Sequence, residues 1–268
     1  MIQSPHKSVD KNVVKGVCRS EPERLQQEVL NSCQQDCILE KQLLESVFTV
    51  ITGIVWRKCM KTVIINGSPR KNWNTAQLLK EAKRGAEEAG HETSFVNLYD
   101  LKFTGCKSCL GCKRAGIAEP CKCYIKDELS PVLDEIYESD HLIIGSPIYF
   151  SQPTGEVRCL LERVCFPPLC YNDYSSNYKR KTDVTVFLTM NAPADMYGNT
   201  YQAGVEAYFE PFHFLNGKVE IIPVCDTLQA NDYSKYEMKS FSEEHKKAVR
   251  ETEFPKALQK AYESGKNN

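Results

Sequence analysis

The sequence predicts an α/β fold in which a doubly wound parallel sheet of five strands is covered by helices on both faces. Short apolar or β-branched segments alternate with amphipathic segments, and two of the apolar segments end in polar loops that open helices. Apolar residues make up 41% of the 268 positions, enough for a sizeable core. The formal net charge of −1 gives no overall basic field that would suggest nucleic acid, so small molecules are the expected partners.

The elements follow one another as strand, helix, strand. Residues 62–65 are β-branched and predict a buried strand, and apolar residues at helical spacing predict a helix over 76–89 that Gly90 ends. The same patterns predict strands at 93–98, 142–145, 183–189 and 219–224, and helices at 127–137, 154–164, 200–215 and 242–262.

The turn between the first strand and the first helix has the composition of a phosphate cradle. A helix N-terminus offers unpaired backbone N–H groups and a partial positive charge, both of which favour a small anion. The turn has one glycine, Gly67, and therefore matches neither a Walker loop nor a dinucleotide fingerprint. The side chains that add donors or charge are Ser68, Arg70, Asn72, Asn74 and Thr75.

Two motifs carry a resemblance to a known family. The pattern Ser68-Pro69-Arg70-x-x-x-Asn74-Thr75 resembles the phosphate loop of the flavodoxin-like NAD(P)H-dependent FMN reductases, which include the iron-sulfur flavoproteins. The segment 142–150 resembles the strand and loop that hold the isoalloxazine ring in that family. The resemblance runs from about Met60 to the C-terminus and implies a flavodoxin-like strand order of 2-1-3-4-5, whose switch point lies between the first and third strands.

The resemblance also assigns site residues. The turn 68–75 would hold the phosphate of FMN, and Asn191, in the loop after the fourth strand, would border the ring or the phosphate. The alternative is that both loops are ordinary βα turns, in which Ser, Pro and Asn are common. The residues that would flank the ring are Pro147, Ile148, Tyr149 and Phe150.

A cysteine-rich loop, residues 104–124, lies between the second strand and the next helix. Cys106, Cys109 and Cys112 form a C-x2-C-x2-C run, which opens the bacterial ferredoxin motif for a [4Fe–4S] cluster and favours iron over zinc. It resembles the cysteine motif of the iron-sulfur flavoproteins, but the gap before a fourth cysteine is longer here. Cys123 is preferred as fourth ligand, with Cys121 as the alternative. Reduced thiols that hold no metal remain the other interpretation.

The function implied by the resemblance is an FMN-dependent oxidoreductase that transfers electrons from NAD(P)H to quinone, nitro, flavin or similar acceptors. The alternative is an iron-sulfur flavoprotein that carries electrons from ferredoxin, and a third is a sensor whose cysteines act as thiol switches. No H-E-x-x-H or G-x-S-x-G motif supports hydrolysis. The family implies a homodimer or homotetramer.

The first 59 residues are expected to be an N-terminal extension, and residues 60–268 the FMN-binding domain. Residues 21–56 contain a rough helical stripe and an apolar stretch too short to span a bilayer. They are interpreted either as a docking helix or as a leader that is not native to the protein. The sequence has no secretory signal and an odd number of cysteines, 13, so a reducing cytoplasmic location is expected.

Overall fold

The computed structural model describes residues 59–116 and 121–267. They fall within one compact unit, Cys59–Asn268. The expected extension lies, except for its last residue, outside the described residues. The strands are β1 (Lys61–Asn66), β2 (Glu92–Asn97), β3 (His141–Pro147), β4 (Thr182–Thr189) and β5 (Asn216–Val224). The α-helices are α3 (Asn74–Glu88), α4 (Ser130–Glu138), α5 (Gly155–Cys165), α6 (Ala194–Met196), α7 (Gln202–Phe209), α8 (Glu243–Thr252) and α9 (Phe254–Lys266).

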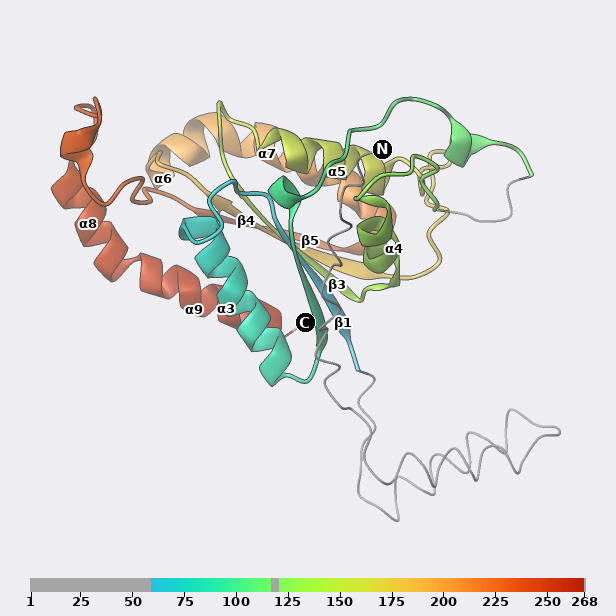
Figure 1. Cartoon of the computed structure of the whole chain (residues 1–268), viewed down its shortest axis with the longest axis horizontal. Helices are drawn as coiled ribbons and strands as arrows, with labels where there is room; N and C mark the ends of the chain where they lie inside the picture. Colours follow the sequence, from blue (N-terminus) through green and yellow to red (C-terminus); the bar gives the residue numbers. More distant parts are fainter. Residues whose placement is uncertain (1–58, 117–120, 268) are drawn as a thin grey trace, which may run out of the picture. The chain divides into compact units, whose positions relative to one another are not determined.

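The five strands form one parallel sheet in the order β2-β1-β3-β4-β5, which confirms the predicted flavodoxin-like topology. In its register, Ile64 of β1 lies between Phe95 of β2 and Ile143 of β3. Helices α3 and α9 cover one face of the sheet, and α4, α5 and α7 cover the other (Figure 1). The connections from β1 and β3 therefore leave in opposite directions, which opens the switch point at their carboxyl ends.

Successive strand residues feed two hydrophobic cores, one on each face. In β1, Ile64 belongs to the core under α3 and α9, whereas Val63 and Ile65 belong to the core under α4, α5 and α7. In β3, Ile143 and its neighbour Leu142 alternate in the same way. A strand buried on both faces loses the alternation of apolar and polar residues, which explains the continuous apolar runs in the sequence.

Two predicted helices are interrupted. The expectation of one helix over 242–262 is wrong, because α8 ends at Thr252 and α9 starts at Phe254. Pro255 lies in the first turn of α9, where its missing N–H costs no hydrogen bond, whereas inside a continuous helix it would break one. The predicted helix at 200–215 is α7, between a π-turn (Tyr197–Tyr201) and a 3₁₀ segment (Glu210–Leu215).

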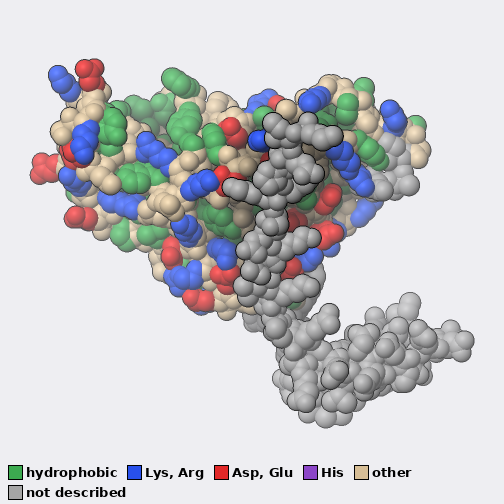
Figure 2. Space-filling view, viewed as in Figure 1, with side chains coloured by type: hydrophobic (Ala, Val, Ile, Leu, Met, Phe, Trp, Pro, Cys, Tyr) green, Lys and Arg blue, Asp and Glu red, His purple; other side chains and the backbone are tan. Residues whose placement is uncertain are grey.

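The described surface carries mixed charge. On the face drawn in Figure 2, basic and acidic side chains interleave without a broad area of one sign. Within the described residues, no helix is both long and apolar enough to cross a membrane.

Candidate functional site

The turn after β1 is built from a chain of short-range hydrogen bonds. The Ser68 backbone N–H donates to Asn66 Oδ1 (3.1 Å), and the Arg70 N–H donates to Ser68 Oγ (3.2 Å). Asn66 is itself fixed by its Nδ2, which donates to Asn97 Oδ1 at the end of β2 (2.9 Å). The turn is thus held to the carboxyl ends of both strands.

The first turn of α3 presents free backbone donors at this edge of the sheet. Trp73 is the N-cap residue, and its side chain caps no N–H group of the helix. The first N–H groups of a helix lack intrahelical acceptors, so an anion placed there satisfies them. Gly67 allows the loop to approach α5, because a Cβ there would lie 2.2 Å from Val157 Cγ2.

The side chains predicted to bind phosphate mostly have partners within the protein. Asn74 Nδ2 donates to the Leu228 carbonyl (2.8 Å), and Asn74 Oδ1 accepts from Arg250 (2.9 Å). Thr75 Oγ1 is buried and shares a hydrogen bond with Thr189 Oγ1 (2.8 Å). These side chains shape the turn, which leaves anion binding to the backbone N–H groups.

The remaining two predicted phosphate residues are exposed. Arg70 donates to the Gln229 carbonyl (2.6 Å), and Asn72 Oδ1 accepts from Lys80 (2.8 Å). The Trp73 indole donates to the Leu228 carbonyl (3.1 Å). The segment after β5 therefore binds the turn through its main-chain carbonyls, and sequence patterns do not reveal such contacts.

The loop after β3 projects an aromatic side chain into solvent. The Ile148 N–H donates to the Thr189 carbonyl (2.9 Å), which ties the loop to β4. Phe150 and Ser151 have φ values of 49° and 65°, and the Phe150 side chain is fully exposed. Two consecutive non-glycine residues in the left-handed region are uncommon and mark a loop held in an unusual shape.

The loops after β1 and β3 are directly joined. Thr154 is the N-cap residue of α5, and its Oγ1 donates to the Gly67 carbonyl (2.8 Å). Tyr99, after β2, lies beside Glu156 at this end of α5, and its pKa is raised by burial and then by Glu156. The structure thus brings 68–75 and 147–150 to one edge of the sheet, as predicted.

Asn191 lies in the loop after β4. Its side-chain oxygen is buried and has no hydrogen-bond partner among the described residues. Its carbonyl accepts from the ammonium of Lys246 in α8 (2.6 Å). A buried acceptor without a donor at the predicted edge of the ring fits a ligand that brings an N–H group, as the isoalloxazine does.

The cysteine-rich loop forms a separate depression against α5. Cys106, Cys109, Cys112 and Cys123 all line it, whereas Cys121 does not. Among the described residues, no three His, Cys, Asp or Glu side chains are close enough to share a single metal ion. Four thiols around one depression are the kind of donor set that holds a [4Fe–4S] cluster.

Helix α5 and the segment after it hold the first half of the cysteine-rich loop. The Cys106 N–H donates to Glu162 Oε2 (3.1 Å), and the Ser108 N–H donates to Cys106 Sγ (3.4 Å). Lys113 donates to main-chain carbonyls at the end of α5, Phe166 and Leu169 among them. These contacts fix Cys106 and Lys113 relative to α5.

A separate cavity of about 410 Å³ lies between the end of β5 and the α8–α9 corner. Leu228 and Arg250, the two partners of Asn74, line it, but no predicted flavin residue does. The flavin assignment therefore rests on the loops after β1 and β3.

Comparison with known proteins agrees with this geometry. Residues 60–192 match the sequence model of the family described as NADPH-dependent FMN reductase. An iron-sulfur flavoprotein of Methanocaldococcus jannaschii is 38% identical over 104 residues, which are 39% of this chain and 51% of that protein. One from Archaeoglobus fulgidus is 36% identical over 104 residues, 39% of this chain and 48% of that protein. The chain spans about half the length of the curated relatives it matches.

Solved structures share the fold. An NAD(P)H:quinone oxidoreductase from Methanothermobacter marburgensis has a TM-score of 0.57 and 16% identity, over 78% of this chain and 97% of that one. An azoreductase from Bacillus anthracis has a TM-score of 0.54 and 12% identity, over 78% of this chain and all of that one. At these identities the likeness concerns the fold alone.

Proposed function

Residues 60–192 belong to the NADPH-dependent FMN reductase family, and from this premise we propose that the chain is an FMN-dependent oxidoreductase. The observation that carries the proposal is the meeting of two loops at the switch point: the turn with free helix N–H groups after β1 and the aromatic loop after β3. Open parallel sheets bind ligands at this place.

The phosphate of FMN would be held by the first turn of α3. Within the described part of the chain, no N-cap side chain binds its backbone N–H groups, and the Arg70 guanidinium lies at the surface of the turn. The partners of Asn74 and Thr75 keep the turn in one shape before the ligand arrives. Preorganised donors gain affinity because little freedom is lost on binding.

The isoalloxazine ring would lie against 147–150 and Asn191. When bound, FMN supplies the chemistry by taking two electrons from NAD(P)H and passing them to a quinone, nitro compound, free flavin or similar acceptor. The protein contributes the open face beside Tyr149 and Phe150, both exposed, where donor and acceptor would bind in turn.

The test compares FMN with riboflavin, which lacks the phosphate. We expect FMN to bind at least about 100-fold more tightly, since two or more charge-assisted hydrogen bonds contribute about 1.5–3 kcal/mol each. Equilibrium dialysis of the full chain measures both affinities. Equal affinity would contradict the phosphate site, and failure of the FMN-loaded protein to oxidise NADH or NADPH with any of these acceptors would contradict the activity.

A second candidate, an iron-sulfur flavoprotein that takes electrons from ferredoxin, is supported by the depression lined by four cysteines. Cys106, Cys109, Cys112 and Cys123 would hold a [4Fe–4S] cluster, which would supply one-electron transfer. Cys123 is favoured over Cys121 because Cys121 does not line the depression.

The cluster is tested by iron and acid-labile sulfide assays on anaerobically purified protein. We expect about four irons per chain in the wild type and in the Cys121→Ser variant, and a clear loss of iron in Cys123→Ser. Loss of iron in Cys121→Ser with retention in Cys123→Ser would reverse the ligand assignment. The absence of iron from the wild type would leave the reductase as the function.

A further inference from the structure

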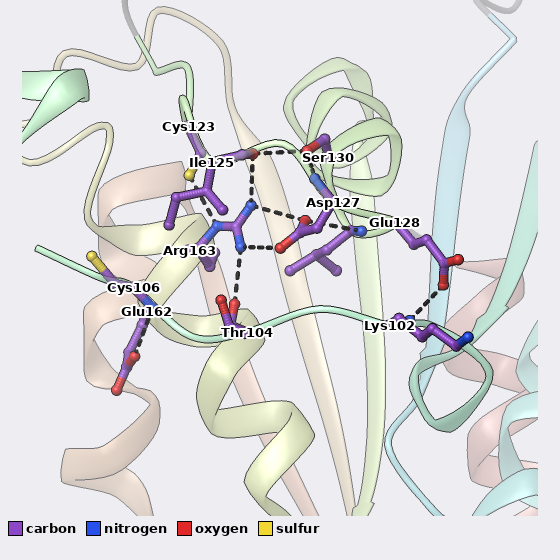
Figure 3. A network of polar contacts seen from close by, with 11 residues as sticks. Lys102, Thr104, Cys106, Cys123, Ile125, Asp127, Glu128, Ser130, Glu162 and Arg163 are labelled. Carbon is purple, nitrogen blue, oxygen red and sulfur yellow. Dashed lines mark hydrogen bonds and ion pairs between the residues drawn. The ribbon is translucent and has the colours of Figure 1, made fainter. Parts of the chain in front are cut away.

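We propose that Arg163 of α5 is a positioning residue for the fourth cluster ligand, and that it raises the reduction potential of the cluster through a hydrogen bond to the Cys123 sulfur. The inference rests on the cluster proposed above. Arg163 Nε donates to Cys123 Sγ at 2.9 Å. The guanidinium lies between the 123–127 segment and Thr104, with its neighbours on every side (Figure 3).

All five N–H donors of Arg163 are used. One amino group donates to Asp127 Oδ2 (2.8 Å) and to the Thr104 carbonyl (2.9 Å). The other donates to Asp127 Oδ1 (3.2 Å) and to the Ile125 carbonyl (3.2 Å). Together with the bond from Nε to the sulfur, these bonds use all the donors of the guanidinium. The side chain has no freedom to leave Cys123 without breaking several bonds.

Arg163 is buried to a degree that is unusual for a charge. It is 1% exposed, and the carboxylate of Asp127 balances its charge from the side away from the sulfur. An arginine is buried at such cost only where its hydrogen bonds are satisfied. Four of the bonds fasten Thr104, Ile125 and Asp127 to α5. The fifth ends on the side-chain sulfur of Cys123.

The bond to the sulfur has a direct consequence for a bound cluster. Reduction adds one electron, and part of the added charge spreads onto the cysteine sulfurs. A hydrogen bond to a ligand sulfur stabilises this more negative state, so the potential rises. A donor on a cationic group has the stronger effect, because charge-assisted hydrogen bonds are about twice as strong as neutral ones. Arg163 and Cys123 both line the depression.

The helix provides a matched control, Arg158. It lies five positions earlier on α5, its side chain is 58% exposed, and its Nε donates to Glu162 (3.0 Å) and not to Cys123. Arg158→Gln and Arg163→Gln therefore remove the same charge from the same helix, and only Arg163→Gln removes the bond to Cys123. Arg163→Lys keeps the positive charge and N–H donors but lacks the planar guanidinium.

The experiment is an anaerobic redox titration of the iron-loaded full chain, with the reduced cluster followed by electron paramagnetic resonance. In Arg163→Gln we expect the equilibrium constant for cluster reduction to fall at least about tenfold, which is about 59 mV for a one-electron couple. Arg158→Gln should leave the potential unchanged, and Arg163→Lys should recover part of the shift. An unchanged potential in an Arg163→Gln variant that still holds iron would overturn the inference.

A second measurement needs no variant, in case Arg163→Gln does not fold. In wild-type protein whose arginines are labelled with nitrogen-15, pulsed electron paramagnetic resonance should detect the hyperfine coupling of one arginine nitrogen to the reduced cluster. No such coupling in the iron-loaded protein would overturn the role of Arg163 and leave the cluster standing. A wild type without iron would overturn the cluster and this inference together.

Discussion

At the scale of single residues, His141 is an ionisable group in the interior. It begins β3, and its Nε2 shares a hydrogen bond with Thr185 Oγ1 (2.9 Å), while its Nδ1 is buried without a partner among the described residues. Burial lowers the pKa of His141 to about 4, against an opposing effect of Asp183. The folded protein therefore holds this imidazole neutral at ordinary pH.

This burial predicts a loss of stability in weak acid. Protons bind the exposed imidazole of the unfolded chain near its usual pKa of 6.5 but bind the folded chain only near 4. The free energy of unfolding should thus be unaffected by His141 above pH 6.5 and fall as the pH drops from about 6.5 to about 4, by up to about 3 kcal/mol. Urea unfolding of the wild type and of His141→Gln at several pH values measures this dependence of the free energy of unfolding on pH. An equally steep decline in His141→Gln would contradict the assignment.

At the scale of elements, two glycines allow α3 and α9 to pack closely. A Cβ on Gly265 of α9 would lie 1.9 Å from the Ala82 carbonyl oxygen in α3, and one on Gly85 would lie 2.0 Å from the Tyr262 carbonyl oxygen. These obstacles are backbone atoms, which yield only if the whole helix moves. The close contact seals the core that contains Ile64 and Ile143.

Gly265→Ala is therefore expected to destabilise the fold. Overpacking of a buried contact costs about 1–3 kcal/mol, and more where backbone must shift. The control is Gly204→Ala in α7, where nothing lies within 4 Å of the added Cβ. That variant should be neutral or up to about 1 kcal/mol more stable, because alanine favours helix over glycine. Thermal unfolding compares them, and equal midpoints for the two variants would refute the packing argument.

Some contacts between elements could not be predicted from sequence patterns. The strands and the two loops follow from local motifs, and the family resemblance of those motifs implied the strand order, so these features could be predicted. Asn74 was assigned to phosphate from its motif, but its partners Leu228 and Arg250 lie 154 and 176 residues away. A carbonyl partner leaves no mark in the sequence. Arg163 was invisible for a related reason, because a charge on an amphipathic helix is usually solvated.

At the scale of the whole molecule, the segment after β5 and helix α8 support the turn after β1, which is proposed to bind the phosphate of FMN. The carbonyls of Leu228 and Gln229 bind the side chains of Trp73, Asn74 and Arg70, and Arg250 of α8 binds Asn74. This segment lies beyond residue 192, where the family match ends. The turn 68–75 is therefore held in shape by a segment that lies outside the motif from which the site was predicted.

One buried ion pair holds this C-terminal segment in place. Lys246 of α8 is 2% exposed and contacts both the Asp226 carboxylate and the Asn191 carbonyl. Burial opposes ionisation of Asp226, but hydrogen bonds from Lys246 and His245 outweigh it and lower the pKa of that carboxyl. Asp226 lies two residues before Leu228, so the pair fixes the segment that binds the turn after β1.

Asp226→Asn should therefore weaken both the fold and the binding of FMN. The ammonium of Lys246 would stay buried without its anion, which costs about 3–5 kcal/mol when one partner of a buried pair is removed. Without the ion pair to α8, the carbonyls of Leu228 and Gln229 would no longer fix the turn, so the affinity for FMN should fall.

The double variant Asp226→Asn/Lys246→Met, which removes both charges, should recover most of the stability. Lys247→Ala, which breaks the exposed pair with Glu243 on the same helix, should change neither property. Urea unfolding and FMN titration of the full chain measure both effects. Wild-type FMN affinity in Asp226→Asn would show that the phosphate turn holds its shape without α8.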